Sequence, residues 1–479
     1  MTQDGTPKHG RDLTTGSIPR HLIAFSMPML AGSALQTAYG LVNAVWVGRG
    51  LGTTAMAAVT VSFPVFFILM AVAGGLTMAA SILVSQSYGA KDWPKLNRVV
   101  RNTFILTSVV GIAFTLIGHF SVELLLRAMN TPREVFSMAA QYLRIFLWAM
   151  PFMFWGFLIS SLLRGTGDSK TPVYFQMVFV GLTAVLDPLF MFGWLGFPKL
   201  GLNGTAVATI ITNCGAAVSM LIYLHMKDHI VAPDWLHLRP DWETSWLALR
   251  IGVPSMVQQG LVSVGAMVII GLVNAYGENG AAAYGAALRI DQLAFMPALT
   301  LGMAVSTLAG QNIGAKEYDR VKEVFRWGLV LSCGITLLCS LLVVTVPGII
   351  LKAFLKDPVV IRLGVHYLRI VGASYILFAV MFVSNGIING AGHTFITTLC
   401  TFISVWAVRV PLAAYLSNHM HKLEGIWYGM VVGFAAGMIT SLAYYFSGRW
   451  KRPITRKMPV TARDVSVAEI TPLPETLID

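Results

Sequence analysis

Long apolar runs recur along the whole chain, separated by short polar breaks. Twelve of them are centred near residues 35, 68, 110, 152, 184, 213, 260, 294, 336, 378, 405 and 435. Each run is long enough to cross a hydrocarbon layer of ~30 Å as a helix. A closed barrel would instead need ~10-residue segments of alternating polarity, which the runs lack. With 56% hydrophobic and 12% charged residues, the sequence predicts an all-α integral membrane protein with twelve transmembrane helices.

The basic residues set the expected orientation. Lys91, Lys95, Arg98 and Arg101 follow the second run, a similar group follows the eighth, and a basic stretch follows the twelfth. Because Lys and Arg favour the cytoplasmic ends of membrane helices, we expect a multi-pass protein of the cell (inner) membrane with both termini in the cytoplasm. The net charge of +12 then indicates contact with anionic lipid head groups rather than with nucleic acid.

The two halves of the chain repeat one another at a shift of 225 positions. Segments 76–91 and 301–316 share nine of sixteen residues at that shift, including Gln-x-x-Gly-Ala-Lys at the end of each. The same shift aligns Gly165 and Gly167 with Gly390 and Gly392. Because each unit holds six helices, both halves enter the membrane from the same side and form parallel repeats, which place a binding cavity between two lobes or within one.

The repeat divides the chain into five segments. A polar segment at residues 1–20 is expected to be mobile, and the first helix is expected from about residue 22 to 47. The amino-terminal lobe, with helices 1 to 6, covers residues 21–226. A polar cytoplasmic linker at 227–245 joins it to the carboxy-terminal lobe, with helices 7 to 12, at 246–448. The tail at 449–479 is basic at first, and we expect it to be disordered.

An acid near the middle of the fifth run, Asp187, is the first candidate for function. A carboxylate at the centre of a membrane helix costs about 3 kcal/mol, so it persists mainly where it faces the bundle interior or water. Pro188 follows it and disturbs the helix there. The repeat does not copy this acid, because the equivalent residue is Leu412. The alternative is a structural polar residue that a hydroxyl or an arginine satisfies.

The first helix also carries polar residues. Gln36, Gly40 and Asn43 lie on one stripe of it, and Pro28 favours a bend. These residues predict a bendable helix with one polar face.

In the carboxy-terminal half, the intramembrane charges include Arg289 and Asp291. Residues two apart on a helix do not face each other, so we expect them to have different partners. For Asp291 we expect a structural ion pair at the inner wall of its lobe.

Together these features resemble the multidrug and toxic compound extrusion (MATE) family, and within it the DNA-damage-inducible-F-like branch. The resemblance covers residues 17–448. It rests on the repeat, on both Gln-x-x-Gly-Ala-Lys segments, and on Ile-Pro-Arg at 18–20, Val-Gly-Arg-Gly-Leu-Gly at 47–52, Leu-Arg-Gly-Thr-Gly-Asp at 163–168 and Asp187-Pro188. It implies two six-helix lobes in a V and export of cationic or amphipathic organic compounds in exchange for protons or sodium ions.

By this resemblance the cation site lies in the amino-terminal lobe, around Asp187. The polar residues expected beside it are Asn43, Thr183 and Thr205, the expected pocket lining is Gln36, Tyr142 and Ser160, and the expected hinge of the first helix is Pro28. The departure is Asn43, which stands where the branch usually has a second acid. A lone carboxylate favours protons as the coupling ion, while the two threonine hydroxyls keep sodium open as the alternative.

Two functions other than export would need residues of which this chain has few. A flippase for a lipid-linked saccharide would need a cavity rich in basic residues, for which this chain offers chiefly Arg289 and Arg409. A membrane enzyme would need clustered acids, histidines or a nucleophile with its base. We expect no enzyme activity, cofactor or metal site, because the cysteines lie inside apolar runs and His419 and His421 have no third ligand in view. The transporter is expected to act as a monomer.

Overall fold

The chain folds almost entirely into helices, most of them long enough to cross a membrane. The computed structural model describes residues 10–234 and 240–452. The first half forms seven helices, which are α1 (Ile18–Gly50), α2 (Thr53–Gly89), α3 (Trp93–Ala128), α4 (Arg133–Leu147), α5 (Met150–Gly165), α6 (Lys170–Phe192) and α7 (Leu202–Met226). The described part contains no strand. The expected tail beyond residue 452 and residues 235–239 of the expected linker lie outside the described residues.

The second half repeats this plan. Its α-helices are α8 (Trp242–Asn274), α9 (Glu278–Gly314), α10 (Tyr318–Thr345), α11 (Pro347–Lys352), α12 (Pro358–Gly372), α13 (Tyr375–Gly390), α14 (Thr394–Phe402), α15 (Val410–Met420) and α16 (Glu424–Phe446). A π-helical stretch, Ile403–Arg409, joins α14 to α15. Nine helices of the described part are long and apolar enough to cross a membrane. Counting each bent pair as one span gives up to eleven.

The two bent pairs occupy equivalent places in the repeat. α4 meets α5 at 48°, and α12 meets α13 at 45°. In the first pair, Pro151 stands in the first turn of α5, where its missing N–H is tolerated. Helix α1 has 33 residues and lies at the first predicted position. When each bent pair is taken as one span, a helix or bent pair lies at each of the twelve predicted positions.

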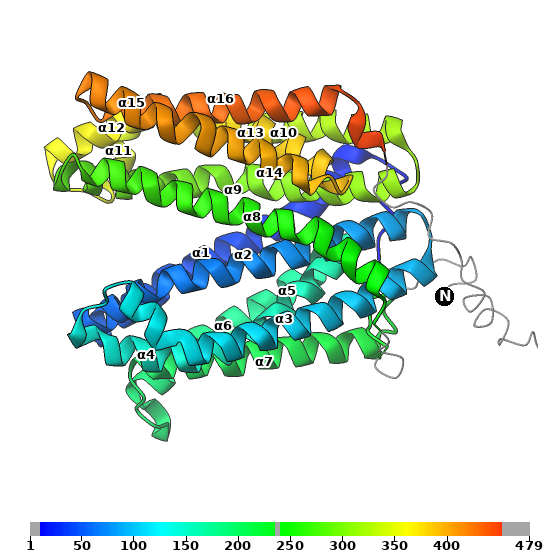
Figure 1. Ribbon diagram of the computed structural model, residues 1–479, viewed down its shortest axis with the longest axis horizontal. Coiled ribbons are helices and arrows are strands. Elements are labelled where there is room, and N and C mark those ends of the chain that lie inside the picture. Colours follow the sequence, from blue (N-terminus) through cyan, green and yellow to red (C-terminus); the bar gives the residue numbers. More distant parts are fainter. Residues whose placement is uncertain (1–9, 235–239, 453–479) are drawn as a thin grey trace, which may run out of the picture.

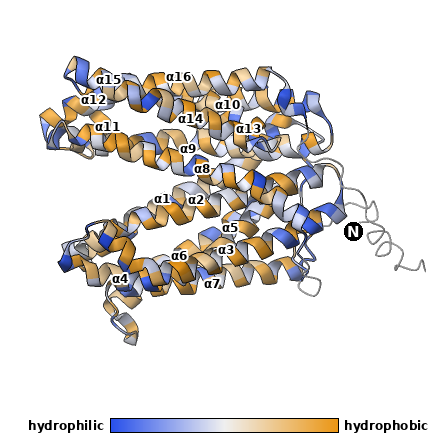
Figure 2. Ribbon diagram, in the orientation of Figure 1, coloured by the Kyte–Doolittle hydropathy of each residue, from blue (hydrophilic) through white to orange (hydrophobic). Residues whose placement is uncertain are grey.

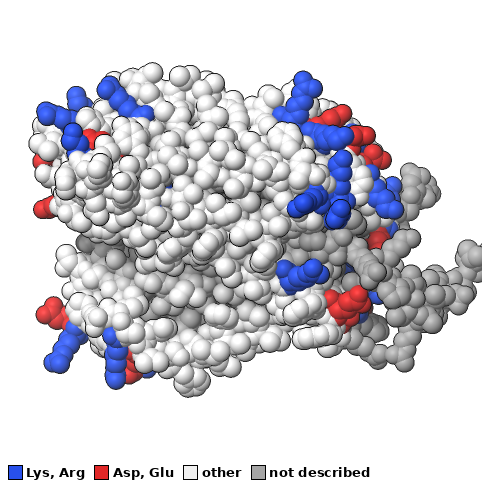
Figure 3. Space-filling view, turned by 45° about the horizontal axis from the view of Figure 1, so that its top comes forward, with Lys and Arg blue, Asp and Glu red and all other residues white. Residues whose placement is uncertain are grey.

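The helices pack into two lobes that lie together at one end and spread apart at the other (Figure 1). One lobe holds most of α1 to α7, and the other holds α8 to α16. Apolar residues predominate along the helices of both lobes (Figure 2). Many large apolar side chains are exposed, and Phe120, for example, is 82% exposed. Lys, Arg, Asp and Glu gather at the two ends and leave an uncharged belt between them (Figure 3). This is the surface expected of a protein that spans a bilayer.

Contacts between the lobes define a closed end, at which α2 and α9 terminate. Gly75 of α2 faces the Gly252 carbonyl and Met256 of α8, and Gly89 of α2 faces the backbone of Gln311 in α9. Toward the opposite end, Phe63 and Phe67 of α2 are exposed. The helices of the two lobes spread apart away from the closed end (Figure 1).

Helix α1 belongs to both lobes. Near the closed end, Leu22 and Phe25 are buried in one cluster with Leu308 of α9 and Val324 of α10. Farther along, Gly32 packs against Gln176 of α6. α1 therefore crosses from the second lobe to the first, as its ribbon does in Figure 1, and Pro28 lies between the two contacts.

The prediction of a mobile segment before α1 is wrong for residues 11 to 16. Leu13 is only 1% exposed, and its backbone bonds to Gln311 and Asn312 of α9. α1 itself begins at Ile18, earlier than expected. The sequence-based prediction rested on the polarity of residues 1–20, whereas the segment is held by its backbone groups and one apolar side chain.

Candidate functional site

Asp187 lies in α6, is 1% exposed and faces α1. Its Oδ2 atom accepts a hydrogen bond from the Tyr39 hydroxyl at 2.8 Å and another from Asn43 Nδ2 at 2.7 Å. Its Oδ1 atom is buried and has no hydrogen-bond partner among the described residues. Hydrogen bonds to an ionised acceptor are about twice as strong as neutral ones, so a charged Asp187 ties α6 firmly to the outer half of α1.

The sequence around Asp187 places it at a weak point of a close helix pair. Pro188 removes one backbone donor inside α6, which frees the carbonyl one turn earlier. A Cβ at Gly204 of α7 would lie 2.6 Å from the carbonyl carbon of Phe190, so only glycine lets α7 approach α6 this closely. α7 thus packs closely on α6 three residues beyond the acid, and the acid itself bonds to α1.

The expected neighbours of Asp187 differ in their contacts. Asn43 bonds to it, as described above. Thr183 lies one turn away in α6, and its hydroxyl donates to the Phe179 carbonyl at 2.6 Å. Thr205 in α7 donates to the Leu202 carbonyl at 2.9 Å. Both hydroxyl protons are thus directed into their own helices, and neither threonine bonds to the carboxylate.

The remaining expected residues lie around this centre. Tyr142 of α4 is buried and faces both Thr205 and Asp187. Gln36 of α1 is exposed, and its Oε1 accepts from Gln176 Nε2 of α6 at 3.1 Å. Ser160 of α5 is half-buried and makes none of the hydrogen bonds at Asp187.

Tyr39 is the residue that the sequence analysis missed. It donates directly to Asp187 and lies one turn before Asn43, whose amide is 3.5 Å from its hydroxyl. The sequence did indicate a role for Tyr39, because positions 36, 39 and 43 share one face of a helix at spacings of three and four. Its aromatic ring made it easy to assign to packing.

Removing the Tyr39 hydroxyl tests this geometry. Tyr39→Phe keeps the ring but takes away one of two donors to Oδ2, and a hydrogen bond to a charged group contributes about 1.5–3 kcal/mol. If the chain exports a substrate, as the resemblance implies, efflux from vesicles should fall roughly tenfold. Tyr174→Phe, on an exposed part of α6, is the matched control. Equal efflux by the two variants would show that the hydroxyl has no role in transport.

The second lobe contains a different buried acid, and the ion pair expected for it is absent. Asp291 of α9 is 4% exposed and accepts hydrogen bonds from the hydroxyls of Tyr367 and Tyr375. No ion pair is formed by Asp291 within the described part. Arg289 is exposed and does not pair with Asp291 in the part of the chain that the structure describes. Two tyrosines satisfy the carboxylate without bringing a second charge out of water, a cost that a buried ion pair carries.

Arg409 of the same lobe forms no ion pair with this acid among the described residues. It is the last residue of the π-helical stretch, its guanidinium carbon lies 4.5 Å from the centre of the Phe434 ring, and its Nε has no hydrogen-bond partner among the described residues. The arginine is therefore held by a cation–π contact.

The tyrosine pair predicts a stabilising role for Asp291. Asp291→Asn keeps the volume but offers one acceptor oxygen where two donors converge, so we expect it to lower the free energy of unfolding by about 2 kcal/mol. Tyr375→Phe removes one donor and should lower it by about 1 kcal/mol. Thermal unfolding in detergent measures both. Unchanged midpoints would mean that the carboxylate contributes nothing to the stability of the lobe.

Comparison with known proteins gives the family. The MatE family model matches the chain twice, at residues 28–189 and 254–415, once in each lobe. The chain belongs to the MatE family. The probable multidrug resistance protein YoeA of Bacillus subtilis is 37% identical over 445 residues, which are 92% of this chain and 96% of that protein. The probable multidrug resistance protein NorM of Thermotoga maritima is 27% identical and covers 91% of this chain and 94% of its own length.

A solved structure shares the fold of this MatE chain. It is described as the outward-facing conformation of a multidrug resistance MATE family transporter of the MOP superfamily. The two superpose with a TM-score of 0.86 over 92% of this chain and 98% of the other, at 24% identity. The twelve-helix, two-lobe architecture predicted from the sequence is thereby confirmed.

Proposed function

We propose that this MatE chain exports cationic or amphipathic organic compounds from the cell in exchange for protons, by alternating access. The names of its relatives, which refer to multidrug resistance, support an efflux function. Among the residues of the chain, the buried carboxylate of Asp187 supports coupling to an ion. We further propose that the transporter acts as a monomer without a cofactor.

The observation that carries the proposal is the pair of hydrogen bonds from α1 to one oxygen of Asp187. In the charged form, Oδ2 holds Tyr39 and Asn43. Protonation makes the carboxyl a weaker acceptor, which releases the outer half of α1. The inner half stays packed on the second lobe, so the released helix bends at Pro28, narrows the pocket and expels the substrate.

Protons fit this site better than sodium. The groups that contact Asp187 are an amide NH₂ and a hydroxyl, both of which donate to it. Hard cations prefer several oxygen ligands, and the hydroxyls of Thr183 and Thr205 bond to helix carbonyls and make no hydrogen bond to the carboxylate in the described residues. A proton needs only one carboxylate oxygen, and Oδ1 has no other partner in the described residues.

The substrate pocket is proposed on the open side of the first lobe. Phe63, Phe66 and Phe67 form a chain of rings whose neighbouring centres lie 6.4 Å apart, and Phe66 also meets Tyr142. Aromatic faces attract organic cations, and they pack against flat apolar groups. The basic closed end is proposed to face the cytoplasm and the open end the outside, in accordance with the positive-inside rule.

Transport in vesicles tests this function. Purified protein is reconstituted, loaded with a fluorescent organic cation, and given a proton gradient or a sodium gradient. We expect efflux to follow the proton gradient and to stop when a protonophore collapses it. Efflux driven by sodium alone would assign the alternative ion, and lipid scrambling without dye efflux would favour a flippase and reject the proposal.

A further inference from the structure

The two Gln-x-x-Gly-Ala-Lys segments meet at the closed end in a symmetric exchange of hydrogen bonds. Gln86 Nε2 of α2 donates to the Gly390 carbonyl at 2.8 Å, and Gln311 Nε2 of α9 donates to the Gly165 carbonyl at 3.0 Å. Gln86 and Gln311 are equivalent in the repeat, and so are Gly165 and Gly390. Each glutamine therefore reaches across the lobe boundary to the same position of the opposite lobe.

The accepting carbonyls lie at helix ends. Gly165 is the last residue of α5 and Gly390 the last of α13, where carbonyls have no partner within their own helix. Both glutamines are buried, with Gln311 0% exposed. When the lobes part, water can take over each of these carbonyls, so the bonds are suited to repeated breaking and reforming.

Backbone contact accompanies these bonds. A Cβ at Gly89 would overlap the Gln311 carbonyl oxygen, and a Cβ at Gly314 would overlap that of Gln86. A Cβ at Gly310 would likewise lie 3.0 Å from Ser85 Cβ. The ends of α2 and α9 thus cross with no room for a molecule between them, and passage to this end requires the glutamine bonds to break.

The segment before α1, residues 11–16, lies over this crossing and engages one glutamine only. Leu13 N donates to Gln311 Oε1 at 3.0 Å, Asn312 Nδ2 donates to the Leu13 carbonyl at 3.3 Å, and Arg320 donates to the Gly16 carbonyl at 3.0 Å. All three partners belong to the second lobe.

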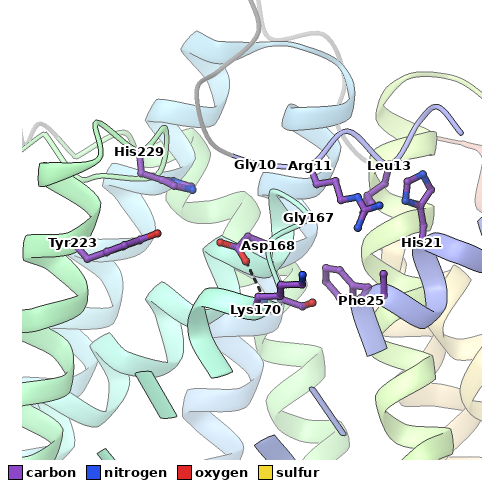
Figure 4. A pocket seen from close by; sticks show the side chains of 12 residues that line it. Gly10, Arg11, Leu13, His21, Phe25, Gly167, Asp168, Lys170, Tyr223 and His229 are labelled. Atoms are coloured by element: carbon purple, nitrogen blue, oxygen red, sulfur yellow. Dashed lines mark hydrogen bonds between the residues drawn. The ribbon is translucent and has the colours of Figure 1, made fainter. Parts of the chain in front are cut away.

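Residues 11–16 make fewer hydrogen bonds to the first lobe than to the second. One backbone bond joins Arg11 N to the Thr166 carbonyl at 2.8 Å. Beside it lies a cavity of about 290 Å³ (Figure 4), whose polar lining includes Arg11, Asp168, Lys170 and His229. Because the segment continues directly into α1, it connects Gln311 to the helix that Asp187 holds.

We propose that Gln86 and Gln311 form the gate that closes the cytoplasmic side of the transport pathway, and that residues 11–16 latch this gate through Gln311. The glutamines act by position and touch no substrate. Gln311 contributes more to closing the gate than Gln86. The Gln311 side chain makes two hydrogen bonds to other segments of the chain, whereas the Gln86 side chain makes one. This inference rests on the transport function proposed above, and it does not depend on which ion Asp187 exchanges.

The test measures access to a buried position at the gate. Ser85 is 0% exposed and faces Gly310, so Ser85→Cys is introduced into a chain whose four native cysteines are replaced. A maleimide is applied to the cytoplasmic side of membranes without any gradient. A hydrogen bond of typical net strength changes an equilibrium about fivefold. We expect Gln86→Ala to raise the labelling rate about fivefold and Gln311→Ala about 25-fold.

Matched variants separate the gate from general damage. Gln141→Ala, whose side chain bonds to Asn203 within the first lobe, should leave labelling unchanged. Leu13→Pro removes the N–H that reaches Gln311, while Leu13→Ala keeps it, so labelling should be faster in the first than in the second. In a Gln311→Ala background this difference should vanish.

The outcomes decide whether the two glutamines act as a gate or only contribute to packing. Unfolding midpoints identify variants that fold, and only folded variants are compared. Slow labelling in both folded glutamine variants, equal to that of the parent, would overturn the gate. If the labelling rates of Leu13→Pro and Leu13→Ala still differed in the Gln311→Ala background, the proposal that residues 11–16 latch the gate would be overturned. Labelling that follows the predicted order would support both, even in a protein whose efflux turns out to be sodium-driven.

Discussion

Asp187→Asn is expected to reduce gradient-driven efflux to the level of vesicles without protein. Asparagine keeps the size of the side chain and can still accept a hydrogen bond from Tyr39 or Asn43, but it cannot carry a proton. A ligand shifts a conformational equilibrium only when it binds the two states differently, and the variant offers the proton no binding site here. Dye efflux under a proton gradient measures the loss.

Two further measurements make this result specific. The variant should stay folded, which thermal unfolding in detergent would show, and it should still bind the substrate at equilibrium. Export that continued at the parental rate in cells exposed to a toxic cation would place the coupling site elsewhere, with Asp291 of the second lobe as the next buried carboxyl to test.

Gly89→Ala is expected to hold the cytoplasmic side open. Its new methyl group would overlap the Gln311 carbonyl oxygen, and this neighbour is backbone that cannot rotate away. Overpacking of this kind costs about 1–3 kcal/mol. We expect the upper end, which shifts the balance between closed and open forms about 100-fold. Labelling of Ser85→Cys should rise accordingly, and efflux should fall with it.

Gly334→Ala provides the comparison. Gly334 lies within α10, and a Cβ there has nothing within 4 Å, so the change should favour the helix slightly and leave labelling and efflux as they were. Normal efflux by Gly89→Ala would mean that the lobes close by a route in which α2 and α9 do not cross so tightly.

Much of the architecture could be predicted from the sequence because the membrane narrows the choices. Apolar runs of bilayer length must be helices, and the repeat of 225 positions required two similar lobes. The position of Asp187 beside Asn43 followed from the cost of a lone charge in the membrane and from the resemblance. These arguments use single residues and spacings, which the printed chain contains.

What escaped prediction depends on pairs of residues far apart in the chain. The Tyr367 and Tyr375 hydroxyls satisfy Asp291 from 76 and 84 positions away, and no periodicity indicates this pairing over an ion pair. The order of residues 11–16 comes from backbone bonds to α9, about 300 positions distant. Backbone groups are nearly the same in every residue, so the amino-acid composition of a segment does not indicate such contacts.

The single carboxylate at the α1–α6 contact also limits the electrical character of the proposed cycle. With one titrating group, one positive charge enters for each substrate that leaves. Exchange of a monovalent drug is then electroneutral and insensitive to voltage, whereas a dication would move one net charge outward, against a membrane potential that opposes it by about 2.3 kcal/mol per 100 mV. Collapsing the voltage while keeping the pH difference should therefore speed the export of divalent compounds and leave monovalent ones unaffected.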